Sequence, residues 1–221
     1  MLNSFFSRNT LFLEVLVFTI AVKMFTEEIK SAVEKLSSGG VVGIPTDTLY
    51  GLAANLFDEN ALDRIYQIKG RPQNLALPVL ISNTEQLQMV SDEISKTSLK
   101  LAHQFWPGPL TLVLPKKDTV SHIATGGLDT IAVRIPNHRV PLAIIEELGF
   151  PITGTSANLS GKPDLITIES VESELGDHLD GLLKCGPRPL GIASTVVDVS
   201  SNEIAILREG VIKSDAIFAC L

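Results

Sequence analysis

The chain has 221 residues, of which 45% are hydrophobic and 19% charged, so it carries enough apolar side chains for a folded core and is neither disordered, collagen-like nor a coiled coil. Its formal net charge of −7 excludes a broad basic face for nucleic acid and restricts any anion site to a local pocket. The two cysteines, Cys185 and Cys220, lie far apart in sequence, which excludes a disulfide scaffold and a thiolate zinc site and favours a reducing cytoplasm.

The amino terminus is apolar over residues 11–22, about half the length that a membrane-spanning helix needs. Its flanks resemble parts of a secretory signal, but the small-x-small cleavage pattern is missing and Glu14 interrupts the apolar run. We therefore expect no membrane contact. Residues 1–23 are interpreted as an extension that precedes the true start at Met24, and residues 24–221 as one catalytic domain.

A helix is predicted to open at Thr26, which is followed by two glutamates, and to close at the glycine pair 39–40. A strand over 41–45 follows it. A second helix is predicted to be capped by Asp58 and to end where Gly70 is followed by Arg71 and Pro72.

Further strands and helices alternate along the rest of the chain. The strand patterns cover residues 77–81, 110–115, 130–136, 182–185, 195–199 and 204–208. Helical patterns lie near residues 84–91, 95–105, 139–148 and 168–175. Because some neighbouring strands are joined by helices and others by short turns, the sequence predicts an α/β fold with a mixed sheet.

The segment PTDTLYGL, at 45–52, is a polar turn directly after a strand, where α/β proteins bind ligands. Its hydroxyl groups could hold a small polar substrate. The same residues are also typical of a local cap, in which Asp and Thr side chains bind backbone amides. Both interpretations stay open.

Four cations stand at the ends of predicted elements in this acidic chain. Lys69 and Arg71 flank a glycine at a helix end, while Arg134 and Arg208 close apolar strands. Each alone is typical of a solvated surface charge, but together they could bind a phosphate or carboxylate. Their convergence in one cavity is therefore the prediction on which the function depends.

Two segments rich in small residues could bring backbone amides close to an anion. In GTSANLSG, at 154–161, Ser156 and Asn158 are two apart and are expected to face the same side of an extended segment. GIASTVVD, at 191–198, places hydroxyl groups at the entrance to a strand. WPGPLT, at 106–111, is interpreted as a rigid turn with a structural role.

Several familiar catalytic patterns are absent from the sequence. It contains no phosphate-binding P-loop, no GxGxxG segment after a strand and no GxSxG nucleophile elbow. The four histidines are scattered without metal-binding spacing. We expect neither a protein-bound catalytic metal nor a serine–histidine triad.

Taken in order, the segments PTDTLYGL, KGRP, PGPLTLVL, AVRIPNH, TSANLSG, STVVD and ILREG closely resemble the YrdC-like family of threonylcarbamoyl-AMP synthases, in its short form. The resemblance runs from about Met24 to Ile212. It implies a twisted mixed sheet flanked by helices around a concave, positive cavity. It also implies a cytoplasmic nucleotidyltransferase that makes threonylcarbamoyl-AMP and pyrophosphate from L-threonine, bicarbonate and ATP, with Mg²⁺ arriving on the nucleotide.

The product would serve a separate tRNA threonylcarbamoyltransferase, which modifies an adenosine beside the anticodon. By resemblance, the residues that contact threonine are Thr48, Arg134, Ser156 and Ser194. Those that contact ATP are Arg71, Thr130, Asn158 and Arg208, with Lys69 adding positive charge near the phosphates.

The chain departs from the family pattern at three positions. Many relatives have an asparagine and a histidine where this chain has Leu75 and Leu80, so those two contacts do not transfer. A polar nucleotide contact is likewise replaced by Ile166.

Two other functions are weighed against the synthase. A module that binds double-stranded RNA would suit a positive cavity, but the net charge and an aromatic content of only 5% argue against it. Carbamoyl transfer to another protein, as in hydrogenase maturation factors, would be expected in a much longer chain with zinc-finger-like cysteines.

Overall fold

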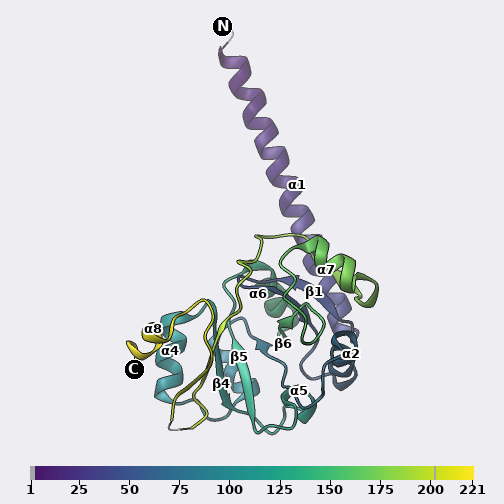
Figure 1. Ribbon diagram of the computed structural model, residues 1–221. Helices are drawn as coiled ribbons and strands as arrows, with labels where there is room; N and C mark the ends of the chain where they lie inside the picture. Colours follow the sequence, from purple (N-terminus) through teal and green to yellow (C-terminus); the bar gives the residue numbers. More distant parts are fainter. Residues whose placement is uncertain (1–2, 202) are drawn as a thin grey trace.

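The computed structural model describes residues 3–201 and 203–221, with side chains from Thr19 onward (Figure 1). The helices are α1 (Asn3–Ser37), α2 (Glu59–Lys69), α3 (Leu87–Val90), α4 (Lys96–Phe105), α5 (His122–Thr125), α6 (Arg139–Leu148), α7 (Ile168–Leu175) and α8 (Ser214–Phe218), with 3-10 turns η1 (Thr84–Gln86) and η2 (Gly176–His178). The strands are β1 (Val42–Pro45), β2 (Tyr50–Ala53), β3 (Val79–Leu80), β4 (Leu110–Pro115), β5 (Thr130–Arg134), β6 (Ile152–Thr153), β7 (Thr155–Ser156), β8 (Gly181–Leu182), β9 (Thr195–Asp198) and β10 (Ala205–Arg208).

Helix α1 begins far earlier than the sequence pattern indicates. The predicted start at Thr26 is wrong, because the segment before it contains no glycine or proline and continues the helical hydrogen bonds without a break. The Thr26 hydroxyl donates to the carbonyl of Val22 at 2.9 Å inside the helix instead of capping its start. The predicted end is confirmed, since Gly39 follows with a φ of 81°.

The amino-terminal half of α1 projects away from the body of the molecule (Figure 1). Residues 19–24 are all exposed, and from Thr19 onward the first buried side chain of the helix is Ile29. From there α1 packs against α6 and β1. None of the helices in the described part of the chain combines the length and apolar composition needed to span a bilayer.

Two helices near the site have the ends that the sequence predicts. Asp58 caps α2, accepting hydrogen bonds from the amides of Asn60 and Ala61 at 3.0 and 3.2 Å, and Gly70 ends it in the left-handed conformation with a φ of 55°. The second helix, α6, is capped by His138. The Gly70 cap fixes the point at which the chain leaves α2 and continues into Arg71.

The polar segment after β1 is a hairpin rather than a turn alone. Strand β2 returns antiparallel to β1, with Ile44 opposite Gly51. These two strands form a mixed four-stranded sheet in the order β7-β2-β1-β8, in which β8 is parallel to β1. The sequence missed β2 because its tyrosine and glycine resemble loop residues.

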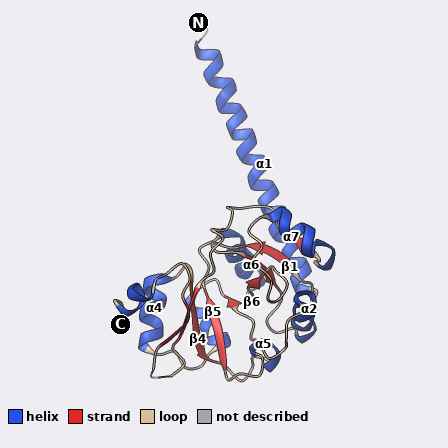
Figure 2. Ribbon diagram, viewed as in Figure 1, coloured by secondary structure: helices blue, strands red, loops and turns tan. Residues whose placement is uncertain are grey.

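The second sheet has six strands in the order β10-β9-β4-β5-β3-β6 and also mixes parallel and antiparallel pairs. The predicted mixed pairing is therefore confirmed, but it is divided between two sheets (Figure 2). Within this sheet β3 runs parallel to β5, which places Leu80 beside Arg134. Strands β6 and β7 escaped prediction because each has only two residues and lies beside Pro151 or Gly154 rather than within an apolar run like that around β3.

The core consists of two clusters of buried apolar side chains. The larger cluster joins α2 and α4 to the six-stranded sheet and includes Leu62, Ile65, Leu101, Leu112 and Val133. The smaller one lies between α1, α6 and β1 and includes Leu36, Ile44, Leu80 and Ile144. Leu80 thus belongs to the smaller cluster while its strand is part of the larger sheet.

Candidate functional site

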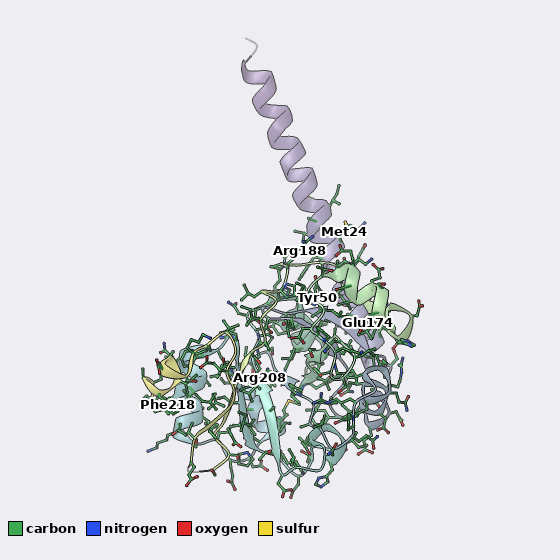
Figure 3. The ribbon with its side chains drawn as sticks, viewed as in Figure 1. Met24, Tyr50, Glu174, Arg188, Arg208 and Phe218 are labelled. Atoms are coloured by element: carbon green, nitrogen blue, oxygen red, sulfur yellow. The ribbon has the colours of Figure 1, made fainter. Side chains whose placement is uncertain are left out.

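One cavity collects side chains from both sheets. It holds about 730 Å³ of empty space, solvent at its open mouth included, which is within the size range of small-molecule sites. Its walls come from the β1–β2 turn and from β2, β3, β4, β5, β7 and β10. Figure 3 marks two of its residues, Tyr50 on β2 and Arg208 on β10.

The β1–β2 turn is built by Thr46. Its hydroxyl donates to the carbonyl of Leu49 at 2.6 Å and accepts from the amides of Thr48 and Leu49, both at 3.2 Å. It also lies 3.1 Å from the hydroxyl of Thr48. The interpretation of this segment as a local cap is therefore correct for Thr46, and this cap fixes the buried hydroxyl of Thr48 in the cavity wall.

Arg134 connects that turn to the segment that contains Gly108. Its Nη1 donates to Thr48 Oγ1 at 2.7 Å, its Nε donates to the carbonyl of Gly108 at 2.9 Å, and its Nη2 forms an ion pair with Asp47. Burial lowers the pKa of Arg134, while Asp47 opposes that shift. The guanidinium has five N–H donors, of which these contacts use three, so two remain for a ligand.

Arg208 and Ser194 form a second polar corner of the cavity. Arg208 donates from Nε to the carbonyl of Ser194 at 3.0 Å and from Nη2 to its hydroxyl at 3.1 Å. The same hydroxyl lies 2.9 Å from that of Thr111 on β4. Gly210 permits this packing, because a Cβ there would lie 2.2 Å from the carbonyl oxygen of Ala193.

Arg71 reaches the cavity from the end of α2. It donates from Nε to the carbonyl of Leu75 at 3.2 Å and from Nη2 to that of Ala76 at 2.9 Å. Partial burial lowers its pKa, but the ordinary pKa of arginine is so high that the group stays charged at neutral pH. Arg71, Arg134 and Arg208 therefore bring three positive charges to one cavity.

Lys69 lies behind the cavity wall and is not among the residues that line it. Only 2% of the residue is exposed, and its ammonium donates to the carbonyls of Ser156 and Asn158 and to the Asn158 side chain. Desolvation lowers its pKa from 10.5 to about 8, with the nearby charge of Arg71 adding to the shift. Lys69 thus anchors the loop that carries Ser156.

Asn158 belongs to this buried anchor as well. Its Oδ1 accepts from the Ser156 hydroxyl at 2.6 Å, and its Nδ2 donates to the carbonyl of Lys162 at 2.7 Å. The expectation that Ser156 and Asn158 face the same side is confirmed. Ser156 lines the cavity, whereas Asn158 does not.

Thr130 stands apart from the other predicted site residues. It begins β5 opposite Pro115, four residues before Arg134 and therefore about 13 Å along the strand, and it does not line the cavity. Of the departures from the family pattern, Leu80 lines the cavity, while Leu75 and Ile166 are exposed and do not.

Sequence reasoning missed two carboxylates. Asp47 pairs with Arg134, and Asp164 lines the cavity together with Arg71 and Arg208. Asp47 lies in a segment singled out for its hydroxyl groups, but the partner of its carboxylate is 87 residues away and no local pattern indicates it. Asp164 follows the small-residue loop and carries no signal of its own.

The predicted convergence in a single cavity is confirmed for Arg71, Arg134 and Arg208, which meet Thr48, Ser156 and Ser194 there, but it is wrong for Lys69, which lies behind the wall. The roles assigned to these residues toward particular ligands stay predictions. Within residues 19–201 and 203–221, whose side chains are described, no three His, Cys, Asp or Glu side chains are grouped as a metal site.

Comparison with known proteins identifies relatives over most of the chain. Residues 34–210 match the family described as telomere recombination and named for Sua5, YciO and YrdC. The chain is 42% identical over 183 residues to a threonylcarbamoyl-AMP synthase of Pyrococcus abyssi, a match that covers 83% of this chain and 54% of the relative. It is 33% identical over 191 residues to a threonylcarbamoyl-AMP synthase of Vibrio campbellii, covering 86% of this chain and all of the relative.

The fold has close counterparts among solved structures. The crystal structure of Pyrococcus abyssi Sua5 complexed with L-threonine superposes with a TM-score of 0.84 at 40% identity, covering 87% of this chain and 57% of that one. The chain thus spans about half the length of the Pyrococcus protein, and it spans the whole of the shorter Vibrio relative.

Proposed function

The chain belongs to the Sua5, YciO and YrdC family, and from this premise we propose that it is a nucleotidyltransferase that makes threonylcarbamoyl-AMP and pyrophosphate from L-threonine, bicarbonate and ATP. The observation that carries the proposal is the single cavity in which three arginines meet the hydroxyl groups of Thr48, Ser156 and Ser194. Its product would be consumed by a separate tRNA threonylcarbamoyltransferase in the cytoplasm.

The arginines suit a nucleotide that brings several negative charges into a partly buried site. Guanidinium groups donate in a fixed planar geometry that matches phosphate oxygens, and Arg71 and Arg208 each keep donors beyond those used on the protein. We assign the phosphates to these two residues. Mg²⁺ would enter with the phosphates as part of the substrate, because it is held mainly by phosphate oxygens and water.

The other corner suits an amino acid. The two free N–H donors of Arg134 can bind a carboxylate, and the hydroxyls of Thr48, Ser156 and Ser194 offer both donors and acceptors to the amine and hydroxyl of threonine. Asp47, which is half-buried, keeps the guanidinium in place because it holds Nη2 from the side of the turn. Thr130 and Asn158 do not line the cavity, so their assignment to ATP requires that they contact the nucleotide from outside the cavity wall.

The reaction needs positioning more than acid–base chemistry. The amine of threonine adds to bicarbonate, releasing water, and forms a carbamate. A carbamate oxygen then attacks the α-phosphorus of ATP, the bond between that phosphorus and the α,β-bridging oxygen breaks, and the β- and γ-phosphates leave as pyrophosphate. Holding carbamate and nucleotide in line supplies several kcal/mol of the barrier, and the arginines stabilise the charge that develops on the leaving pyrophosphate.

The test is an assay of pyrophosphate release by the purified protein with ATP and magnesium. We expect release only when L-threonine and bicarbonate are both present, and a product of the mass of threonylcarbamoyl-AMP. Arg134→Ala, which removes the proposed carboxylate ligand, serves as the inactive comparison. Release that ignores threonine or bicarbonate would contradict the synthase.

A further inference from the structure

Leu80 is an apolar side chain in a cavity made mainly of polar groups. It is only 3% exposed, lines the cavity and pairs in register with Arg134 on the neighbouring strand. Paired residues of adjacent strands project to the same face of a sheet, so Leu80 stands beside the guanidinium that we assign to the amino-acid substrate.

The backbone of Gly154 packs closely against the side chain of Leu80. A Cβ at position 154 would lie 2.5 Å from Leu80 Cγ and 2.8 Å from each of its methyl carbons, so the leucine occupies the space that any larger residue would need. The amide of Gly154 donates to the carbonyl of Pro78 at 2.7 Å, which fixes the two segments against each other. Leu80 therefore has a defined position in the cavity wall.

We propose that Leu80, held by Gly154, is the residue that determines specificity for the side chain of the amino-acid substrate, through contact with its β-methyl group. This inference rests on the proposed function. Threonine has an amine, a carboxylate and a hydroxyl, all of which need polar partners, and these are available at Arg134, Thr48 and Ser156. The methyl is its one apolar group, and it gains most by leaving water against Leu80.

The contact would separate threonine from its nearest analogues. L-Serine lacks the methyl and would leave a void against Leu80, whereas L-3-hydroxynorvaline carries an ethyl group that would collide with it. A single methyl or methylene in an apolar pocket changes affinity by roughly four- to tenfold or more.

The test is calorimetric binding of these three amino acids to the whole protein. We expect Leu80→Ala to lower the threonine-to-serine affinity ratio by about four- to tenfold and to admit L-3-hydroxynorvaline. Leu80→Val removes less of the side chain, so it should change the threonine-to-serine ratio and the binding of L-3-hydroxynorvaline in the same direction but to a lesser extent. Gly154→Ala should also lower the ratio, but by narrowing the cavity: the new Cβ displaces Leu80 into it, so threonine loses more affinity than serine and L-3-hydroxynorvaline stays excluded.

Val79→Ala is the matched control. Val79 is the neighbour of Leu80 on β3, fully buried in the larger core cluster and absent from the cavity wall, so its truncation should lower stability without changing the ratio. An unchanged ratio in both Leu80 variants, with threonine still bound by the wild type, would overturn this inference alone. A wild type that binds no threonine would overturn the proposed function and the inference with it.

Discussion

At the scale of single residues, the two arginines assigned to the phosphates give the most direct prediction. Arg71→Ala and Arg208→Ala should each weaken ATP binding by about 1.5–3 kcal/mol, the range of a charge-assisted hydrogen bond. The measurement is isothermal titration with ATP. Arg64→Ala is the control, because Arg64 pairs with Asp180 at 2.8 Å outside the cavity and should leave nucleotide affinity unchanged. Unaltered affinity in the Arg71 and Arg208 variants would remove both from the site.

The carboxylate of Asp164 is expected to oppose the same ligand. It lines the cavity, and its charge acts on Arg208 and on Lys69. Asp164→Asn removes one negative charge from the walls and should tighten binding of metal-free ATP by about threefold at low salt, with a smaller gain at high salt. Titration with ATP at two ionic strengths measures this. Weaker binding by the variant would show instead that Asp164 helps to hold the nucleotide.

The buried ammonium of Lys69 predicts a pH dependence of stability. Its pKa falls to about 8 in the folded protein, whereas the unfolded chain keeps the ordinary value of 10.5. Between these values the unfolded chain binds more protons, so this group makes the free energy of unfolding rise with pH from about 8 to 10.5 and leaves it flat below 8.

This contribution can be isolated by comparing the wild type with Lys69→Met in urea denaturation across that pH range. The pKa of Cys185, which burial raises to about 12, acts in the opposite direction above pH 9, but it is common to both proteins and cancels in the difference. We expect the stability advantage of the wild type over the variant to grow with pH. A constant advantage would show that folding leaves the pKa of Lys69 unchanged, and a shrinking one that folding raises it; either contradicts the prediction.

Lys69 also shows how far single residues could be interpreted from the sequence. The position of Lys69 near a helix end was predicted correctly, but the direction of its side chain was not, since it bonds to Ser156 and Asn158 about 90 residues later. The arginines were easier to place, because each follows an apolar element whose end the pattern defines. Long-range partners such as Asp47 of Arg134 depend on tertiary contacts alone.

At the scale of elements, α1 predicts that residues 1–23 are dispensable for folding. Residues 19–24 are exposed. Among the described side chains of the helix, contacts with the body begin at the half-buried Phe25, whose ring lies 4.6 Å from the Arg139 guanidinium, and continue at the buried Ile29. A protein that starts at Met24 should unfold within about 2 °C of the full chain, because surface changes rarely exceed 0.5 kcal/mol. It should also keep threonine-dependent pyrophosphate release.

A protein that starts at Lys30 is the comparison for this truncation. It loses Phe25 and Ile29, and also Glu28, which accepts hydrogen bonds from the amides of Lys184 and Cys185 at 2.9 and 3.2 Å. Its unfolding temperature should drop by several degrees. A comparable loss in the protein that starts at Met24 would mean that the projecting part of α1 packs on the core.

The elements that the sequence predicts well are those whose ends carry local chemistry. α2 has Asp58 before it and Gly70 after it, and both boundaries agree with the prediction. β4, whose six residues are apolar except for Thr111, agrees at both ends as well. The two-residue strands β6 and β7 exist only through pairing with distant strands, so no local signal could reveal them.

At the scale of the whole molecule, the two sheets explain why the site is a cavity rather than a surface. Ser156 comes from the four-stranded sheet and Thr48 from the turn that joins two of its strands, while Leu80, Arg134 and Arg208 come from the six-stranded sheet. Their convergence depends on how the sheets meet, which mixed strand pairing alone does not specify. The sequence pattern predicts the strands, and the resemblance to a family predicts that they surround a positive cavity.

The charge of the whole chain yields the last prediction, which concerns double-stranded RNA. Binding to A-form RNA needs cations spread along a face that follows successive phosphates. Here the net charge is −7, and three arginines are gathered in one cavity where they also bind protein oxygens. We therefore expect a labelled RNA duplex to bind no tighter than about 10⁻⁴ M at physiological salt in fluorescence anisotropy, the weak limit of non-specific binding. Micromolar binding that falls steeply with added salt would contradict this and would require a basic face outside the cavity.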